Sequence, residues 1–386
     1  MLPDIAAHAP TLQAWRRDLH AHPETAFEEV RTSAFVAETL ASFGVTVHRG
    51  LGGTGLVGVI EGTAPGPTIG LRADMDALPM DEETGADYRS TAPGRFHGCG
   101  HDGHTVMLLG AARHLAANPP RRGKVHLIFQ PAEEVGLGAQ RMIEDGLFER
   151  FPCSEVYALH TIPLYAEGTA AVRPGPTLAG IAAFEIRIDG VGGHGAAPHT
   201  TIDPLQVAAR LATEISSIVG RHVDPLAPAV ISLGRLSAGT APNIIPASAE
   251  LSGTIRTYDP AVEALILKKL DAICQGFALM SGCTVACTQK ASCLPCVNDP
   301  RAAAAAAAAA GEVLGIGHVH TDMKPLPFSD DFALMLDQWP GAYIFLGQPG
   351  AMCHHPTFDF DDRLLPVGAS ILARIATRQT MEGASA

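Results

Sequence analysis

The segment FHGCGHDGHT, residues 96–105, concentrates side chains that bind metals. Each of its reactive side chains can coordinate a metal ion or hydrogen-bond to a residue that does; they are His97, Cys99, His101, Asp102 and His104. Glycines at positions 98, 100 and 103 let the backbone fold tightly enough for Cys99 and His101 to reach one ion. This density favours a metal site over a glycine-rich loop with internally bonded histidines.

Two adjacent carboxylates, Glu133 and Glu134, follow the apolar run KVHLIFQ directly. Adjacent glutamates commonly lie on a solvated helix face. In open α/β sheets, however, ligands gather beyond the carboxyl ends of the strands, and this pair follows a predicted strand. We therefore predict that one glutamate coordinates metal and that the other accepts a proton from an activated water molecule.

Two further histidines follow predicted strands. His160 ends EVYALH, and His354 lies in the loop after GAYIFLG. A single histidine at a strand end is more often structural than a metal ligand. Several candidate ligands at strand ends that converge favour a metal site. Together with Cys99, His101 and Glu134 they form a set of sulfur, nitrogen and oxygen donors that suits Zn²⁺, Mn²⁺ or Co²⁺ rather than Mg²⁺ or Ca²⁺. Five protein ligands exceed the three usual for one catalytic zinc, which predicts two divalent ions.

Residues 181–292 add three polar candidates. His194 lies between glycines, where it can donate a hydrogen bond to an oxyanion. Arg256 can bind a carboxylate through two parallel hydrogen bonds, and Asn243 can add a donor. Each also has an ordinary structural interpretation. The cysteines at 283, 287, 293 and 296 are interpreted as core thiols, because only C-L-P-C resembles a zinc knuckle.

The elements that position these residues follow an α/β pattern. Short apolar runs at 55–62, 68–74, 124–130, 155–160 and 341–347 predict buried strands, and 9–20, 30–43, 104–118 and 138–146 predict helices. This alternation predicts a largely parallel sheet flanked by helices. Residues 181–292 instead predict β-α-β-β-α-β, a ferredoxin-like inserted domain. The expected catalytic domain comprises 1–180 and 293–386.

Composition limits the possible functions. The 386 residues include 27 Lys+Arg and 40 Asp+Glu, a net charge of −13 that argues against general nucleic-acid binding. No apolar stretch reaches the ~18 residues needed to span a membrane, and no secretory signal is recognisable at the start. Eight cysteines in such a chain are expected to be thiols or metal ligands. We expect a cytoplasmic protein with no membrane association.

These motifs resemble the dinuclear metallopeptidase superfamily of aminoacylases and carboxypeptidases, in particular its amidohydrolase branch with hippurate hydrolase and the auxin-conjugate hydrolases. The resemblance extends almost from end to end. The motifs that carry it are LHAHPETAFEE (19–29), LRADMDALPMDEETG (71–85), FHGCGHDGHTVMLLGAA (96–112), LIFQPAEE (127–134), GGHGAAPH (192–199), NIIP (243–246), GTIR (253–256) and HHPTFDFDD (354–362).

The resemblance implies a role for each matching residue. The implied metal ligands are Cys99, His101, Glu134, His160 and His354. Glu133 matches the catalytic base, and Asp76 matches a carboxylate that orients the site. His194 matches a histidine that reaches the neighbouring subunit's active site in family dimers. Asn243 and Arg256 match contacts to the substrate carboxylate.

We therefore expect a metal-dependent amidohydrolase that cleaves N-acyl amino acids, and a homodimer or higher oligomer formed through the inserted lid and dimerisation domain. The nearest alternative is a dipeptidase or carboxypeptidase with the same metal chemistry. A non-catalytic metal-containing binding protein is the alternative of a different class; the complete ligand set and the presence of Glu133 argue against it.

Overall fold

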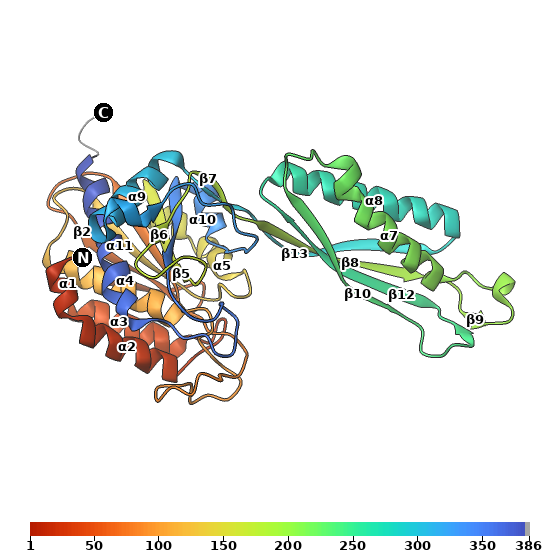
Figure 1. The fold of residues 1–386 in the computed structure, drawn as a ribbon, viewed down its shortest axis with the longest axis horizontal. Helices are drawn as coiled ribbons and strands as arrows, with labels where there is room; N and C mark the ends of the chain where they lie inside the picture. The colour runs from red at the N-terminus through yellow and green to blue at the C-terminus, as the bar shows by residue number, and fades with distance from the viewer. Residues whose placement is uncertain (383–386) are drawn as a thin grey trace. The chain divides into compact units, whose positions relative to one another are not determined.

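The computed structural model describes residues 1–382, which divide into two compact units. The first comprises 1–177, 297–324 and the chain from 330 onward, and the second comprises 178–296 and 325–329. Figure 1 follows the chain through both units. No helix among these residues is long and apolar enough to cross a bilayer.

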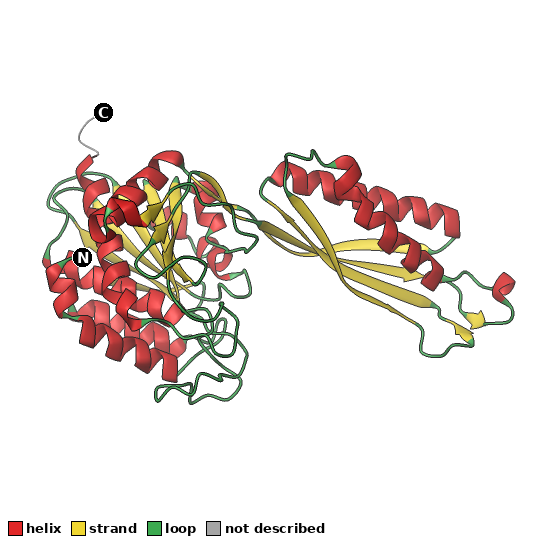
Figure 2. Ribbon diagram, in the orientation of Figure 1, coloured by secondary structure: helices red, strands yellow, loops and turns green. Residues whose placement is uncertain are grey.

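The first unit is built on an eight-stranded sheet (Figure 2). In spatial order its strands are β1 (Thr46–Leu51), β2 (Gly55–Glu61), β4 (Lys124–Gln130), β3 (Thr68–Asp74), β5 (Glu155–Ile162), β16 (Gly341–Gly347), β6 (Ala170–Ala171) and β15 (Val319–His320). The four central strands β4, β3, β5 and β16 are mutually parallel, whereas β1, β2 and β6 introduce antiparallel pairs toward the edges.

Helices cover this sheet. They are α1 (Pro3–Ala7), α2 (Ala9–Ala21), α3 (Val30–Ser42), α4 (His101–Ala117), α5 (Gly138–Glu144), α6 (Leu147–Arg150), α9 (Pro300–Leu314), α10 (Ala333–Gln338) and α11 (Leu365–Glu382). The main core lies between the sheet and a layer that includes α2, α4, α9 and α11. Because the central strands are buried on both faces, they appear in the sequence as continuous apolar runs.

The second unit contains the predicted order of six elements: β8 (Gly180–Asp189), α7 (Pro204–His222), β10 (Ala229–Ala238), β12 (Ser248–Thr257), α8 (Pro260–Ser281) and β13 (Thr284–Cys293). Its sheet has the order β10-β12-β8-β13 and is antiparallel throughout. Alternate residues of β8 are buried against α7 and α8. Asp203 caps α7 by accepting hydrogen bonds from the amides of Leu205 and Gln206.

Small elements complete the chain. β9 (Gly193–His194) pairs with β11 (Ile244–Ile245), and β7 (Gly175–Leu178) pairs with β14 (Cys296–Asn298). The predicted fold class, an α/β sheet flanked by helices together with a ferredoxin-like unit, is confirmed. The prediction of a largely parallel sheet holds for its four central strands, and the antiparallel strands β1, β2 and β6 lie to either side of them.

Candidate metal centre

The carboxyl ends of the four central strands lie at one edge of the sheet, since those strands are parallel. β3 ends at Asp74, two residues before Asp76, and β4 ends three residues before Glu133. β5 carries His160 near its end, and the chain continues from β16 to His354. This topology brings residues far apart in the sequence to one place.

All five predicted metal ligands converge at this edge. Cys99, His101 and His160 form one group with ligand atoms within 4.8 Å of one another, and Cys99, Glu134 and His354 form a second. Cys99 Sγ lies 3.5 Å from His160 Nε2, and His354 Nε2 lies 3.2 Å from Glu134 Oε2. Glu134 Oε1 lies 3.9 Å from His101 Nε2. The two groups share Cys99.

Hydrogen bonds fix the orientation of two of the imidazoles. His101 Nδ1 donates to the backbone oxygen of Asp76 at 2.9 Å, and His160 Nδ1 donates to that of Thr161 at 2.7 Å. Each ring therefore turns Nε2, with its lone pair, toward the other donors. Gly100 has φ +88°, and a Cβ there would lie 3.1 Å from Thr161 Oγ1, so glycine permits the turn between Cys99 and His101.

Asp76 holds the segment that carries the two glutamates. Its Oδ1 accepts from the amide of Glu133 and its Oδ2 from the amide of Glu134, both at 3.0 Å. Glu133 Oε2 lies 3.9 Å from His101 Nε2, and the Glu133 side chain is 11% exposed. The predicted base therefore lies beside the predicted ligands with its carboxylate nearly buried.

The electrostatics of the site show an excess of negative charge. Burial, followed by the carboxylates of Asp330 and Glu134, raises the pKa of Glu133 well above its usual value. Burial alone would lower the pKa of His101, but Asp74, Asp76 and Glu134 raise it to about 10. Neighbouring carboxylates thus raise the pKa of both groups, in addition to burial for Glu133 and against burial for His101, and a cation would offset this negative charge.

The side chains themselves fit a metal. In the described chain His101 Nε2 and Glu134 Oε1 are both buried without a hydrogen-bond partner. Unpartnered buried polar atoms are costly and are rare unless they contact a ligand, an ion or water. The mixture of thiol, imidazole and carboxylate donors is the one expected for zinc, manganese or cobalt. These residues therefore suit divalent transition-metal ions.

A buried ionic cluster around Arg72, which the sequence did not predict, lies next to the site. Arg72 pairs with Asp74 at 2.6 Å, Asp330 at 3.1 Å and Asp331 at 3.3 Å. Asp74 Oδ1 accepts from His104 Nδ1 at 2.7 Å, and His104 Nε2 in turn accepts from the amide of Thr161. His104 thus links β3 to β5 behind the predicted ligands. In the sequence only His104 was recognised as a possible partner of the ligands, whereas Arg72, Asp330 and Asp331 gave no signal.

The three polar candidates of the second unit lie at two places. His194 and Asn243 lie together, because the amide of Gly195 donates to the Asn243 backbone oxygen at 2.9 Å. The amide of Ala196 donates to His194 Nδ1 at 3.0 Å, which leaves the proton of the exposed ring on Nε2. Arg256 does not join this pair: its guanidinium donates to the Pro327 backbone oxygen and to Ser329 Oγ.

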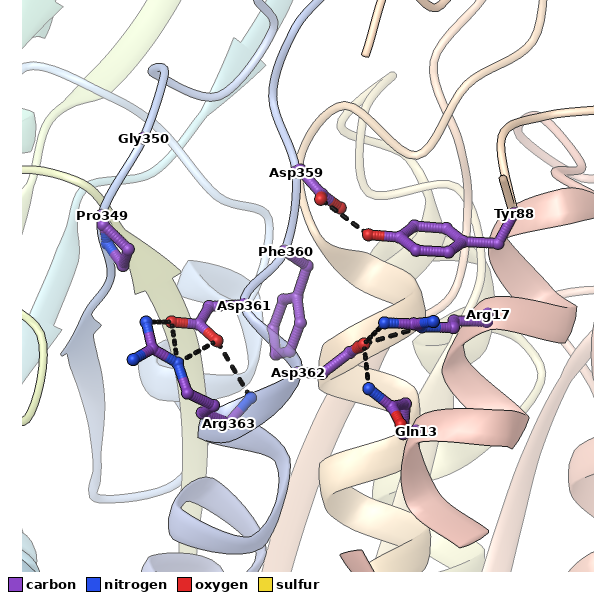
Figure 3. A pocket seen from close by; sticks show the side chains of 10 residues that line it. All are labelled: Gln13, Arg17, Tyr88, Pro349, Gly350, Asp359, Phe360, Asp361, Asp362 and Arg363. Atoms are coloured by element: carbon purple, nitrogen blue, oxygen red, sulfur yellow. Dashed lines mark hydrogen bonds and ion pairs between the residues drawn. The ribbon is translucent and has the colours of Figure 1, made fainter. Parts of the chain in front are cut away.

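A surface pocket of about 440 Å³ lies elsewhere on the first unit (Figure 3). Arg17 lies over the Tyr88 ring, 4.2 Å from its centroid, and pairs with Asp362 at 2.8 Å. The Tyr88 hydroxyl donates to Asp359 at 2.7 Å. None of the predicted catalytic, substrate or metal residues lines this pocket, and the charged side chains drawn in Figure 3 are paired with one another or with Tyr88.

An α/β sheet with parallel central strands, a donor set of this kind and a nearly buried carboxylate beside it suit a metal-dependent hydrolase. The chain belongs to peptidase family M20/M25/M40, whose model matches residues 70–378. The resemblance inferred from the motifs is thereby confirmed.

Similar proteins extend over nearly the whole chain. A hippurate hydrolase of Campylobacter jejuni is 36% identical over 379 residues, covering 98% of this chain and 99% of that protein. An Arabidopsis thaliana protein named IAA-amino acid hydrolase ILR1-like 4 is 37% identical and covers 95% and 85%. A thermostable carboxypeptidase of Saccharolobus solfataricus is 38% identical and covers 94% of each.

Solved structures agree. A Bacillus subtilis protein described as a dinuclear metal binding peptidase from the M20 family superposes with a TM-score of 0.85 at 30% identity, covering 98% of this chain and 99% of that one. The similarity includes both units of the chain and is not confined to the motifs.

Proposed function

We propose that the protein is a metal-dependent amidohydrolase that cleaves N-acyl amino acids into a carboxylic acid and a free amino acid. The observation that carries this proposal is the convergence of five donors in two groups that share Cys99, with Glu133 beside them. Relatives named hippurate hydrolase and IAA-amino acid hydrolase, both at least 36% identical, support the substrate class.

Two divalent ions are the proposed cofactor, with zinc, manganese or cobalt as the candidates. Cys99, His101 and His160 would hold one ion, and Cys99, Glu134 and His354 the other. When bound, such ions supply Lewis-acid activation of a water molecule and of the substrate carbonyl. Cys99 belongs to both groups, which makes it the candidate for a shared ligand.

The chain's own residues supply the proton transfers. Glu133, whose backbone amide donates a hydrogen bond to Asp76, accepts a proton from the attacking water on its carboxylate and later delivers it to the leaving amide nitrogen. His194 donates a hydrogen bond from Nε2 to the oxyanion, since Nδ1 already accepts from Ala196. We assign the substrate carboxylate to Asn243 and Arg256, whose side chains can both donate hydrogen bonds to it.

A homodimer is proposed for the assembly, formed through the second unit. β10 is an edge strand of that unit's sheet and exposes Val230 and Leu236, while Leu279 and Met280 at the end of α8 are strongly exposed. Exposed edges and apolar side chains of this kind are suited to pairing with a second copy. We also infer a cytoplasmic location, because a reducing compartment keeps a Cys99 thiolate available.

A panel of substrates tests the activity. Protein loaded separately with zinc, manganese and cobalt is assayed for kcat/KM on N-benzoyl, N-acetyl and indole-acetyl amino acids, with dipeptides and C-terminally blocked peptides beside them. Preference for N-acyl amino acids by tenfold or more supports the proposal. Preference for peptides would favour the alternative, a carboxypeptidase or dipeptidase, which the 38% identity to a thermostable carboxypeptidase supports. Stoichiometric binding without turnover would indicate a binding protein.

A further inference from the structure

The turn that carries Glu133 and Glu134 begins in an unusual backbone conformation. Ala132 has φ +53°, in the left-handed region that residues with a Cβ avoid. It is fully buried, so the strain is maintained by the surroundings rather than by solvent. Strained residues of this kind concentrate at functional sites, where the fold holds a side chain in a particular direction.

The buried carboxylate of Glu29 binds the amide of Ala132. Glu29 Oε1 accepts a hydrogen bond from the amide of Ala132 at 2.9 Å and another from the amide of Phe27 at 3.0 Å. Phe27 is also left-handed, with φ +63°. The other oxygen, Oε2, accepts from Thr54 Oγ1 at 2.5 Å, and the Glu29 side chain is fully buried. Hydrogen bonds thus hold both carboxylate oxygens of Glu29 in place.

Glu29 and Asp76 together bind three consecutive amides. The amide of Ala132 donates to Glu29, and the next two amides, of Glu133 and Glu134, donate to the two oxygens of Asp76. Because these amides are directed at fixed acceptors, the backbone of the turn has little freedom. The directions of the Glu133 and Glu134 side chains follow from that backbone.

We propose that Glu29 is a positioning residue for Glu133: by binding the amide of Ala132 it holds the left-handed turn that aims the base at the metal centre. This inference rests on the proposed function for the role of Glu133, but not for the geometry of the turn. Glu29 acts from the N-cap of α3, 103 residues before Ala132, and its carboxylate accepts hydrogen bonds from Phe27, Thr54 and Ala132, none of which is a predicted ligand.

A double substitution tests the mechanism. Glu29→Ala removes the acceptor, and we expect kcat to fall about tenfold to a hundredfold with KM changed less than threefold, because a displaced base slows chemistry more than binding. Glycine adopts positive φ without strain, so Ala132→Gly in the Glu29→Ala background should restore kcat by about fivefold. Ala132→Gly alone should stay within about twofold of the parent. Glu38→Ala, on the exposed face of α3, is the matched control.

Amide hydrogen exchange provides a readout that does not need turnover. In metal-free protein Glu29→Ala should accelerate exchange of the amides of residues 132–134 at least tenfold and leave β4 unchanged. If Glu29→Ala does not fold, Thr54→Val, which removes only the donor to Glu29 Oε2, should give a smaller change in the same direction.

The outcomes separate the two proposals. Unchanged exchange at residues 132–134 overturns the positioning role, and so does a loss of kcat that Ala132→Gly fails to restore, since that would indicate a general loss of stability. Absence of turnover in the parent protein on every N-acyl amino acid would refute the proposed function. Accelerated exchange in Glu29→Ala would even then support the conclusion that Glu29 holds the turn at residues 132–134.

Discussion

Replacing Asp76 by asparagine changes one atom of the site and should be costly. In the protein each carboxylate oxygen of Asp76 accepts one amide, from Glu133 and from Glu134, at 3.0 Å. An asparagine of the same shape offers one acceptor oxygen, and its NH₂ group faces the other amide, so one of the two hydrogen bonds is lost. A hydrogen bond to a charged acceptor contributes about 1.5–3 kcal/mol.

That free energy converts directly into a rate. If the lost bond positions the base in the transition state, kcat/KM should fall about 10- to 150-fold, since about 1.4 kcal/mol corresponds to a factor of ten. Bound metal should stay near the parent value, because all five donor side chains are unchanged. The assay is kcat/KM on the best N-acyl amino acid of the panel, with metal content measured on the same sample.

A matched control distinguishes positioning from the loss of a charge. Asp81 is exposed and accepts a single amide, that of Gly94 at 2.8 Å, so Asp81→Asn retains its one bond and should leave kcat/KM unchanged. The reasoning is refuted if Asp76→Asn, with full metal content, stays within threefold of the parent. It is equally refuted if restoring metal to the variant restores its activity.

Three other predictions concern separate residues. Glu133→Gln should retain bound metal while kcat falls by about 10²- to 10⁴-fold, because the amide cannot accept the proton; kinetics and metal content measure this. Mixing inactive His194→Ala with inactive Glu133→Gln subunits should restore part of the activity if His194 of one subunit completes the active site of the other. An activity assay after subunit exchange detects the recovery. Burial lowers the pKa of His126 to about 4, so the folded protein keeps this ring neutral while the unfolded chain takes up a proton near pH 6.5. The free energy of unfolding should therefore fall by about 2 kcal/mol between pH 8 and pH 5 through this residue, and His126→Gln should lack that component in urea titrations.

Each of these has a contrary outcome. Near-normal kcat in fully metallated Glu133→Gln would remove it as the base. No recovery of activity despite demonstrated subunit exchange would place His194 outside a shared site. If the free energies of unfolding of the parent and of His126→Gln change in parallel with pH, the His126 ring does not stay neutral in the folded protein below its ordinary pKa. Comparing the two proteins cancels the titration of the metal-centre side chains, which both contain.

Much of the fold could be predicted because its signals are local. The strands β3, β4 and β16 begin and end where their apolar runs do, since buried parallel strands are bounded by polar and turn residues. The predicted ligands could be found for a similar reason, because Glu134, His160 and His354 lie near or after the ends of strands, Cys99 lies just before α4 and His101 begins it. Proximity to a strand end, repeated four times, was sufficient to predict that they meet.

The supporting residues could not be found in this way. Glu29 lies 103 residues from Ala132, and Arg72 lies 258 residues from Asp330, and no spacing in the sequence connects either pair. Glu29 appears there as one of two adjacent acids before a helix, which is typical of a solvated helix start. Only the folded chain shows that it is buried and bound to a strained turn.

The distribution of charge connects these observations. Around the predicted ligands the first unit buries six carboxylates against the single guanidinium of Arg72; they are Asp74, Asp76, Glu133, Glu134, Asp330 and Asp331. Such an excess is unfavourable unless cations offset it. Two divalent ions would supply four positive charges, which together with that of Arg72 would offset five of the six negative charges. A protein of net charge −13 can then bind an anionic N-acyl amino acid, because attraction depends on the local charge at the site rather than on the total.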